Sequence, residues 1–311
     1  MNKVIFIVGP TASGKTALSV KLAKKIGGEI ISADSMQIYK GIHIASAAPD
    51  EGERQGIPHH MLEFLEQNEE YSVAEYVKNA RRLIKEISEK GKIPVIVGGT
   101  GLYISSLLDN TEYTEQATDL SLRKALEEKY ESIGGEQMLK ELAEFDPDSA
   151  KRLHPNNKKR IIRAFEVYKQ SGINVTQQNE MSHKSSADFD SLVIGITYQD
   201  RELLYERINK RVEQMCENGL LDEARISYDS GNSKGAFQAI GHKELFGYFE
   251  GRLTLEQAKE NLKQQTRRYA KRQLTWFRKD QRINWIYADK CEDVFSAAQK
   301  LINDFLRSEK N

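Results

Sequence analysis

The 311-residue sequence contains only two cysteines, Cys216 and Cys291, and neither belongs to a Cys-x-x-Cys pair. A disulfide framework or a structural zinc site is therefore not expected, whereas a reducing, cytoplasmic environment is. Long apolar runs are also lacking. The run nearest the start, Val4 to Val8, is too short for the core of a signal peptide or for a membrane span.

The sequence has no excess of either charge, because 46 lysines and arginines balance 46 aspartates and glutamates. This balance argues against a protein that binds nucleic acid over its whole surface, but it leaves local basic patches open. With 39% hydrophobic and 30% charged residues, the composition is that of an ordinary globular protein. No internal repeat is present. The length allows one large α/β domain with a smaller insertion, or two modest domains.

The first hundred residues alternate between strand and helix patterns. Three short β-rich apolar runs predict buried strands over Val4 to Val8, Glu29 to Ala33 and Pro94 to Val97. Between them, apolar residues recur at helical spacing up to Gly27-Gly28, and Ser72-x-x-Glu75 is a capping box that opens a second helix. This β-α-β order predicts a mainly parallel, doubly wound sheet.

The pattern changes near residue 112. Residues 112–189 are rich in Glu, Lys, Ser and Asn without a convincing strand, so we expect an inserted helical domain. One helix there begins near Asn157, ends at Gly172 and is expected to bury Ile161, Phe165 and Tyr168. The core domain thus comprises 1–111 and 190–311. Its second part is expected to hold a strand over 191–198, helices over 200–218 and 255–280, and a short strand over 284–287.

The first predicted strand runs into a complete G-x-x-x-x-G-K-[ST] motif, formed by Gly9, Pro10, Thr11, Ala12, Ser13, Gly14, Lys15 and Thr16. The glycines let backbone N–H groups turn toward a polyphosphate, and the following helix adds the positive end of its dipole. Lys15 neutralises charge, and the Thr16 hydroxyl can bind Mg²⁺. A chance match is the alternative, but the position between a strand and a helix argues against it. We therefore predict a P-loop NTPase-like α/β fold with a helical insertion.

The P-loop alone does not specify the ligand. The sequence has no Asn-Lys-x-Asp or Asp-x-x-Gly motif of a GTPase. Its third predicted strand ends in Gly-Gly-Thr, where many P-loop enzymes carry an acid that holds the metal. The group bound by the loop stays open at this point.

Polar residues follow the second and third predicted strands. Ligands of open parallel sheets bind beyond the carboxyl ends of the strands, so we expect Asp34 and Thr100 near the group held by the P-loop. Asp34 is suited to act as a general base, with a helix cap or an outer metal ligand as alternatives. Thr100 can hydrogen-bond the reacting group, or it can simply satisfy loop backbone.

Two other groups are weak signals. Arg207 and Arg211 share the polar face of a predicted helix, where arginines are usually only solvated. His59 and His60 are adjacent and point apart on either a helix or a strand, so we expect no metal site there.

Basic and aromatic residues alternate near the end of the chain. Between 263 and 282 the cations Arg267, Arg268, Lys271, Arg272, Arg278 and Lys279 face a single acid, Asp280, with Tyr269, Trp276 and Phe277 interleaved. Helical spacing puts Lys263, Arg267 and Lys271 on one stripe and Ala270, Leu274 and Phe277 on an inward one. A smaller cluster comprises Lys158, Lys159, Arg160 and Arg163. Such runs are often only a solvated face, but two of them beside a phosphate site favour RNA binding.

Together these motifs resemble the tRNA dimethylallyltransferase family, also called tRNA isopentenyltransferases, in family order over nearly the whole chain. The motifs are the P-loop, Ser32-Ala33-Asp34-Ser35-Met36-Gln37-Ile38-Tyr39, Gly56-Ile57-Pro58-His59-His60, Val97-Gly98-Gly99-Thr100-Gly101-Leu102-Tyr103, Ala239-Ile240-Gly241-His242-Lys243-Glu244 and Lys271-Arg272-Gln273-Leu274-Thr275-Trp276-Phe277-Arg278. The C-terminal zinc finger of eukaryotic members is absent from this sequence, so the resemblance is to the bacterial type.

The resemblance implies transfer of a dimethylallyl group from dimethylallyl diphosphate to the exocyclic amine of the tRNA adenine on the 3′ side of the anticodon (position 37). The diphosphate would lie in the P-loop with Mg²⁺ at Thr16. Asp34 would be the base, Thr100 would hold the amine, and Arg211 would offset charge on the leaving diphosphate. The adenine would be flipped out of its stack. We expect a monomer.

The resemblance also implies a set of contacts with the anticodon stem-loop, largely through phosphates. These residues are Asp34, Ser35, Met36, Gln37, Thr100, Arg123, Lys158, Lys159, Arg160, Ile161, Ile162, Ile240, Gly241, His242, Lys243, Lys271, Arg272, Trp276 and Arg278. One departure stands out. Where the family usually has Gly-Thr-Ala-Lys-Pro, this chain has Ala45-Ser46-Ala47-Ala48-Pro49, so a lysine is missing and tRNA affinity is put in doubt.

Two other functions fit part of the sequence. A small-molecule kinase would explain the P-loop and Asp34 but would leave the basic tract and the Gly-Gly-Thr-Gly loop without a role. An RNA-binding regulator that senses a nucleotide would explain the basic tract without any catalysis.

Overall fold

The computed structural model describes residues 1–113, 119–182, 188–231 and 235–308. Its contacts divide the chain into two compact units. The first comprises Met1–Leu108 and Asp188–Asn311, and the second comprises Asp109–Ala187.

The first unit is built on a six-stranded sheet in the order β3-β2-β4-β1-β5-β6, in which every pairing is parallel. The strands are β1 (Asn2–Val8), β2 (Gly28–Ser32), β3 (His59–His60), β4 (Ile93–Gly98), β5 (Phe189–Thr197) and β6 (Ile283–Tyr287). All five apolar residues of β1 from Val4 to Val8 are fully buried, as helices on both faces of a parallel sheet require. The predicted parallel α/β fold is confirmed.

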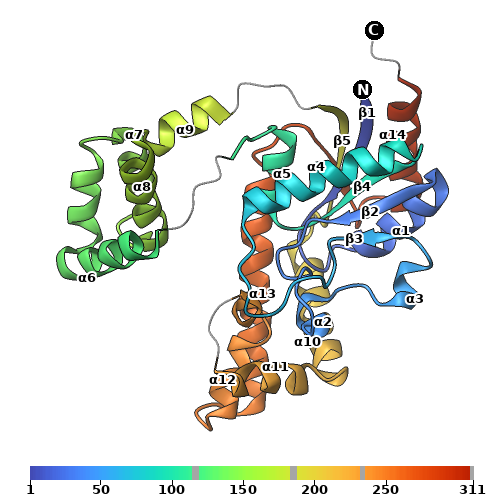
Figure 1. Cartoon of the computed structure of the whole chain (residues 1–311). Helices are drawn as coiled ribbons and strands as arrows, with labels where there is room; N and C mark the ends of the chain where they lie inside the picture. The colour runs from blue at the N-terminus through green and yellow to red at the C-terminus, as the bar shows by residue number, and fades with distance from the viewer. Residues whose placement is uncertain (114–118, 183–187, 232–234, 309–311) are drawn as a thin grey trace. The chain divides into compact units, whose positions relative to one another are not determined.

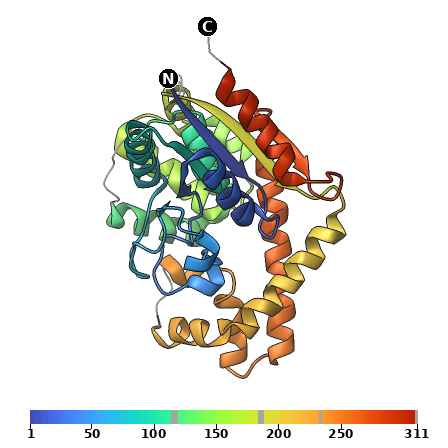
Figure 2. The same cartoon turned by 90° about the vertical axis from the view of Figure 1, so that its right-hand side faces the viewer.

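Helices cover both faces of this sheet (Figures 1 and 2). On one face α1 (Lys15–Ile26) packs with α14 (Val294–Arg307), and their apolar residues join alternate residues of the strands in one core. On the other lie α4 (Val73–Glu89) and α5 (Gly101–Leu108), where Tyr76 and Tyr103 stack with ring centroids 3.9 Å apart. The predicted capping box is present, since Ser72 and Glu75 exchange hydrogen bonds at the start of α4.

The carboxyl ends of the strands lead into short elements and a helical extension. The short helices are α2 (His43–Ser46) and α3 (Glu51–Arg54). The extension consists of α10 (Arg201–Glu217), α11 (Leu220–Asp229), the 3₁₀ turn η1 (Gly235–Gln238), α12 (Lys243–Phe249) and α13 (Leu255–Phe277). Its own small core joins α10, α11, α12 and α13 through Val212, Leu220, Leu245 and Leu262. Figure 1 shows α13 running from this core back to the sheet.

The described part of the second unit contains helices and no strand. They are α6 (Leu120–Leu142), α7 (Pro147–Arg152), α8 (Lys158–Ser171) and α9 (Val175–Ser182). Of the expected insertion, residues 114–118 and 183–187 lie outside the described residues. Helix α8 ends at Gly172 in the left-handed region, as its sequence predicts.

The buried face of α8 differs from the prediction by one residue. Ile161 and Phe165 lie in the core of the unit, as expected, but Tyr168 is 39% exposed. Its ring stacks on Phe145, with centroids 4.0 Å apart, at the edge of that core. Ile162, which was not expected in the core, is buried there as well.

Within the described ranges, no helix is both long and apolar enough to cross a membrane.

Candidate active site

The P-loop connects β1 to α1 and has the backbone shape that its glycines permit. Gly14 caps α1 with φ 94°, a left-handed conformation that favours glycine. A Cβ on Gly9, where φ is 145°, would lie 2.2 Å from the carbonyl oxygen of Ile196. The loop therefore turns tightly against β5 and leads into the amino end of α1, where backbone N–H groups favour an anion.

Lys15 is held in an environment that disfavours its charge. Burial, and then the positive charge of Arg211, lower the pKa of Lys15 to about 7, although the Asp34 carboxylate acts in the opposite direction. Its Nζ donates to the carbonyl of Pro10 at 2.6 Å. A bound polyphosphate would restore the charge on the lysine, because a nearby anion favours the protonated amine.

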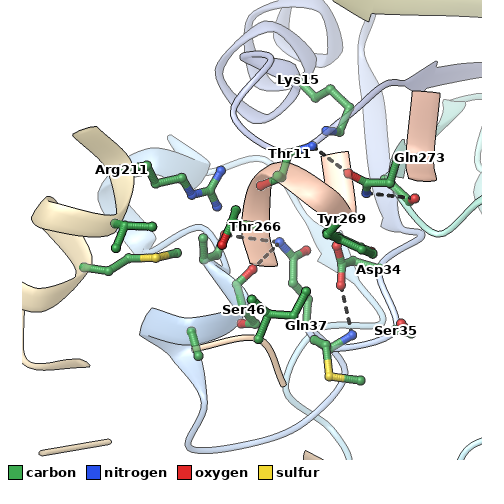
Figure 3. A pocket seen from close by; sticks show the side chains of 18 of the residues that line it. Thr11, Lys15, Asp34, Ser35, Gln37, Ser46, Arg211, Thr266, Tyr269 and Gln273 are labelled. Carbon is green, nitrogen blue, oxygen red and sulfur yellow. Dashed lines mark hydrogen bonds between the residues drawn. The ribbon is translucent and has the colours of Figure 1, made fainter. Parts of the chain in front are cut away.

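A cavity of about 310 Å³ lies beyond the carboxyl ends of β1, β2 and β4, within the size range of small-molecule sites. Figure 3 shows Lys15, Arg211, Asp34 and Tyr269 around it, with Arg211 on the side opposite Asp34 and Tyr269. A second cavity of about 740 Å³ lies against the P-loop. The two share five lining residues, namely Lys15, Thr16, Ala47, Arg211 and Met215. The P-loop lysine is therefore accessible from two adjoining spaces.

Asp34 follows β2 and lines the first cavity. Its Oδ1 accepts a hydrogen bond from the backbone N–H of Met36 at 2.9 Å, which fixes the carboxylate at the start of the next turn. The positively charged side chains of Lys15 and Arg211 interact electrostatically with the Asp34 carboxylate. The structure thus brings Asp34 and the P-loop lysine to the same space.

Thr100 is not among the residues that line the cavity. Its Oγ1 accepts from the backbone N–H of Ser35 at 3.0 Å and donates to the Ser35 hydroxyl at 3.3 Å. This is the role of a hydroxyl that satisfies loop backbone, and it ties the loop after β4 to the loop after β2.

Tyr269 also lines the cavity and was not expected there as a site residue. Burial and the nearby Asp34 charge raise the pKa of Tyr269 well above its usual value, against a weaker effect of hydrogen bonds to Thr100 and Gln273. The phenol therefore stays protonated and remains a hydrogen-bond donor beside the carboxylate.

Gln273 joins helix α13 to both polar loops. Its Oε1 accepts from the backbone N–H of Thr11 at 2.8 Å, and its Nε2 donates to the carbonyl of Gly99 at 2.9 Å. The close approach explains Gly99, since a Cβ there would lie 2.1 Å from the Gln273 amide nitrogen. One sequence signal could have revealed it: a polar residue stands among the inward positions Ala270, Leu274 and Phe277 of the helix.

Helix α10 aims an arginine into the site. Arg211 lines both cavities, and burial lowers its pKa despite the opposing charges of Asp34 and Glu53. The interpretation of Arg211 as a solvated residue is therefore wrong, because the helix crosses over the P-loop. Arg207 stays exposed, but its Nε donates to the carbonyl of Ala12 at 3.0 Å.

The basic stripe on α13 is only partly solvated. Lys263 contacts Glu213 at 2.6 Å, and Arg267 contacts Glu260 at 2.9 Å and Asn209 at 2.7 Å, so these two cations face α10. The inward stripe of Ala270, Leu274 and Phe277 is buried as predicted. Lys271, Arg272, Trp276 and Arg278 are exposed at the carboxyl end of the helix, and the Trp276 ring lies over Gly101.

Three expected RNA contacts have side chains that are out of reach. His242 is fully buried, while its neighbours Ile240 and Lys243 line the first cavity. Ile161 and Ile162 are 0% and 2% exposed in the core of the second unit. RNA contact at these three positions stays a prediction, and in this conformation it would have to be made by the backbone, because each side chain faces inward from its element.

The remaining expected RNA contacts of the second unit are exposed or partly exposed cations. Lys158 contacts Glu131 at 2.5 Å, and Arg123 lies 3.5 Å from Glu127. Lys159 and Arg160 are exposed.

No group of three or more His, Cys, Asp and Glu residues that could hold a metal ion occurs within the described ranges. His60 bonds to Glu29 at 2.7 Å and His59 to the carbonyl of Ile57 at 2.8 Å, so both histidines have structural partners. Thr16 and Asp34 do offer oxygen atoms to the first cavity. This set fits Mg²⁺ held mainly by a ligand phosphate and water, which is how that ion usually binds.

The parallel sheet, the P-loop at its carboxyl edge, and the adjoining cavity lined by a carboxylate, an arginine and a tyrosine define an α/β protein of the P-loop class. Comparisons with known proteins are more specific. A family model described as IPP transferase matches residues 37–280.

Named tRNA dimethylallyltransferases are similar over nearly the full length. That of Acetivibrio thermocellus is 46% identical over 306 residues, covering 98% of this chain and 96% of the relative. That of Carboxydothermus hydrogenoformans is 47% identical over 304 residues, covering 97% of each.

Solved structures agree. The full-length tRNA isopentenylpyrophosphate transferase of Bacillus halodurans is 40% identical with a TM-score of 0.71, covering 98% of this chain and 96% of that one. A eukaryotic dimethylallyltransferase acting on tRNA is 31% identical with a TM-score of 0.83, covering all of this chain and 81% of that one. This chain belongs to the IPP transferase family, and the predicted resemblance is confirmed.

Proposed function

We propose that this chain transfers the dimethylallyl group of dimethylallyl diphosphate to the exocyclic amine of the adenine 3′ of the tRNA anticodon. The observation that carries the proposal is the shared space at the sheet edge. A phosphate-binding loop, a carboxylate and an arginine meet there, with a second opening on the other side of Lys15. The tRNA dimethylallyltransferases that resemble this chain over nearly their whole length support the substrate pair.

The transfer forms one C–N bond and breaks one C–O bond. The lone pair of the adenine amine is delocalised into the purine, so the amine is a poor nucleophile and gains from loss of its proton. Asp34, which lines the cavity, accepts that proton as the new bond forms. The Tyr269 phenol and the Thr100 hydroxyl, joined beside Asp34, orient the loop that carries the carboxylate.

The other product is diphosphate, which gains negative charge as the C–O bond breaks. Lys15 and Arg211, which line both cavities, offset this charge. The Thr16 hydroxyl would hold Mg²⁺, which supplies further neutralisation of the leaving group when bound.

Two adjoining cavities suit two substrates that enter separately. The larger one, against the P-loop, has Arg207, Lys210 and Arg211 in its lining and suits the charged diphosphate. The smaller one is bordered by Met36, Met215 and Tyr269 and suits a nucleobase that has left its stack. Ala48, where the family usually has lysine, lines the larger cavity, and Lys210 lines it as well. We propose that Lys210 supplies part of the missing charge.

The tRNA partner would be bound through phosphates by the exposed cations at the end of α13 and by the Lys159 and Arg160 side chains of the helical insertion. A monomeric, cytosolic enzyme is part of the same proposal.

Mass spectrometry of tRNA incubated with the protein, Mg²⁺ and dimethylallyl diphosphate tests the function. We expect one adenosine to gain the mass of a dimethylallyl group less the displaced proton. No gain on any nucleoside would contradict a transferase and leave only an RNA-binding protein. Calorimetry with ATP and with the allylic diphosphate addresses the kinase alternative, which tight ATP binding alone would favour.

A further inference from the structure

His242 of the Ala239–Glu244 motif is buried and has no part in the proposed chemistry of the cavity. It is 0% exposed, although Ile240 and Lys243 on either side of it line the first cavity. A buried imidazole in a loop that borders a reaction cavity needs a physical account, because its polar atoms require partners.

Those partners form a chain of hydrogen bonds. The His242 Nδ1 lies 2.8 Å from the Ser227 hydroxyl, and its Nε2 lies 2.9 Å from Oε1 of Glu223. The Glu223 carboxylate also accepts from the backbone N–H groups of Ile44 at 2.7 Å and Ala45 at 2.9 Å. Because an ionised carboxylate only accepts, Nε2 donates to Glu223, and the Ser227 hydroxyl is the partner of Nδ1.

The chain of bonds ends on the backbone of a cavity wall. Residues 45–47 line the first cavity, His43, Ile44, Ala47 and Ala48 line the second, and Ala47 belongs to both. The wall carries small side chains over Ala45-Ser46-Ala47-Ala48, so the placement of its backbone decides its shape. On the cavity side, the Gln37 amide donates to the carbonyl of Ala47 at 3.1 Å.

The turn that carries His242 also packs directly against this wall. Gly241, with φ 120°, lies against Ala45, and a Cβ on it would come 3.2 Å from the Ala45 Cβ. One buried network therefore holds the 45–47 wall and the Ile240–Lys243 turn, which are two sides of the first cavity.

A Ser–His–Glu chain has the composition of a nucleophile triad, but burial excludes that role here. Ser227 is 1% exposed and His242 is 0% exposed, so no substrate reaches the hydroxyl. The Glu223 carboxylate, at the other end of these hydrogen bonds, accepts from the backbone N–H groups of Ile44 and Ala45.

We propose that Glu223 and His242 are positioning residues that hold the 44–47 wall at the junction of the two cavities, and thereby place the donor and the adenine for transfer. The inference rests on the proposed transferase function. Since reacting groups displaced by about 1 Å lose about a hundredfold in rate, loosening this wall slows the reaction without touching a reacting atom.

The test is steady-state prenyl transfer by Glu223→Gln beside Asp222→Asn. Both changes remove one carboxylate from the first turn of α11, and Glu223 is the carboxylate that accepts from the wall. Three donors converge on Glu223, whereas an amide has one acceptor oxygen and adds two N–H donors. We expect kcat/KM for the allylic diphosphate to fall about 10- to 100-fold in Glu223→Gln and to change less than about twofold in Asp222→Asn.

A second pair separates positioning from folding. His242→Gln keeps a donor near Nε2 and is expected to retain most of the rate, whereas His242→Leu is not. Assays run at a temperature where circular dichroism shows each variant folded. If Glu223 has a purely structural role, Glu223→Gln should have a lower melting temperature but wild-type kcat and KM. That result would overturn the proposal, even if His242→Leu fails to fold. An inactive wild-type protein would instead refute the transferase function.

Discussion

At the scale of single residues, the cavity couples a carboxylate to two cations in surroundings that disfavour charge. Burial lowers the pKa values of Lys15 and Arg211, and Asp34 acts against burial in both cases. The three groups therefore depend on one another. We therefore expect a diphosphate bound beside the two cations also to change the electrostatic surroundings of Asp34.

Asp34→Asn tests the proposed base with almost no change of volume. We expect turnover to fall by about two to four orders of magnitude, because the amide cannot take the proton, while tRNA affinity is retained. Single-turnover transfer and a tRNA filter-binding assay measure the two quantities. Near-normal turnover would remove Asp34 from the mechanism.

Gln273→Leu tests the hydrogen bonds by which α13 holds the P-loop and the loop after β4. The substitution leaves the Thr11 N–H and the Gly99 carbonyl without their partner. We expect the free energy of unfolding to fall by about 1–3 kcal/mol for each group left unsatisfied, and diphosphate affinity to fall as the P-loop loosens.

Gln264→Leu is the matched control for Gln273→Leu, because Gln264 is exposed on the same helix. Urea unfolding and calorimetry with inorganic diphosphate provide the readouts. Equal stability of the two variants would show that the tie contributes nothing.

At the scale of elements, local sequence patterns predicted the helices, strands and turns that interactions between residues close in sequence determine. The buried strands, the P-loop, the capping box of α4 and the long helices α10 and α13 follow from runs of a few residues. The structure also contains elements that these patterns missed. Strand β3 has only two residues and exists because its neighbour β2 pairs with it, and α11 and α12 are short helices held by the core of the extension.

The missed site residues depend on contacts between distant parts of the chain. Gln273 meets Thr11 across 262 positions, and Glu223 meets Ile44 across 179. No periodicity or spacing encodes such a pairing. Arg211 was tied to the site only by family resemblance, because its spacing alone could not show that α10 crosses the P-loop.

The buried carboxylate of Glu29 in β2 bonds to His60 in β3 and to Lys92 just before β4, and these bonds predict a pH dependence of stability. Burial by itself would raise the pKa of Glu29, but hydrogen bonds from Lys92 and His60 outweigh it and hold the pKa below its usual value. A lowered carboxyl pKa stabilises the fold above the unfolded-state value of about 4.3, and this stabilisation is lost as the pH falls through the folded-state pKa.

Glu29→Gln should therefore lower the free energy of unfolding by about 1–3 kcal/mol at neutral pH and flatten its decline in acid. Urea unfolding at a series of pH values measures both. Glu86→Gln, a partly exposed partner of Arg82 on α4, serves as the control. An acid decline of wild-type steepness in Glu29→Gln would show that the strand carboxylate is not its cause.

Helix α13 carries polar ties on one side and exposed cations at its end. Arg278→Gln should weaken tRNA binding and lower the slope of log K against log salt by about 0.7–0.9, the share of one phosphate contact. Lys300→Gln, an exposed cation on α14, removes a charge elsewhere on the same unit and should leave the slope unchanged. An unaltered slope in Arg278→Gln would count against its phosphate contact.

At the scale of the whole molecule, a protein of zero formal net charge is proposed to bind a polyanion. Affinity must then come from local patches, and each of the two units carries one. Many cations are already neutralised within the chain, as Lys263 is by Glu213 and Lys158 by Glu131. Exposed cations such as Arg278 and Lys159 must then supply the salt dependence of binding.

The helical insertion provides the last test, because its part in tRNA binding rests on two exposed cations of α8. Lys159→Gln combined with Arg160→Gln should weaken anticodon stem-loop binding and lower the salt slope by about 1.4–1.8. Lys169→Gln, exposed near the other end of the same helix, is the control. If both units bind one tRNA, the loss of slope should add to that of Arg278→Gln, since the sites are independent. A variant that combines all three substitutions but has the same salt slope as Arg278→Gln alone would exclude the insertion from phosphate binding. The tRNA would then be bound by the P-loop unit.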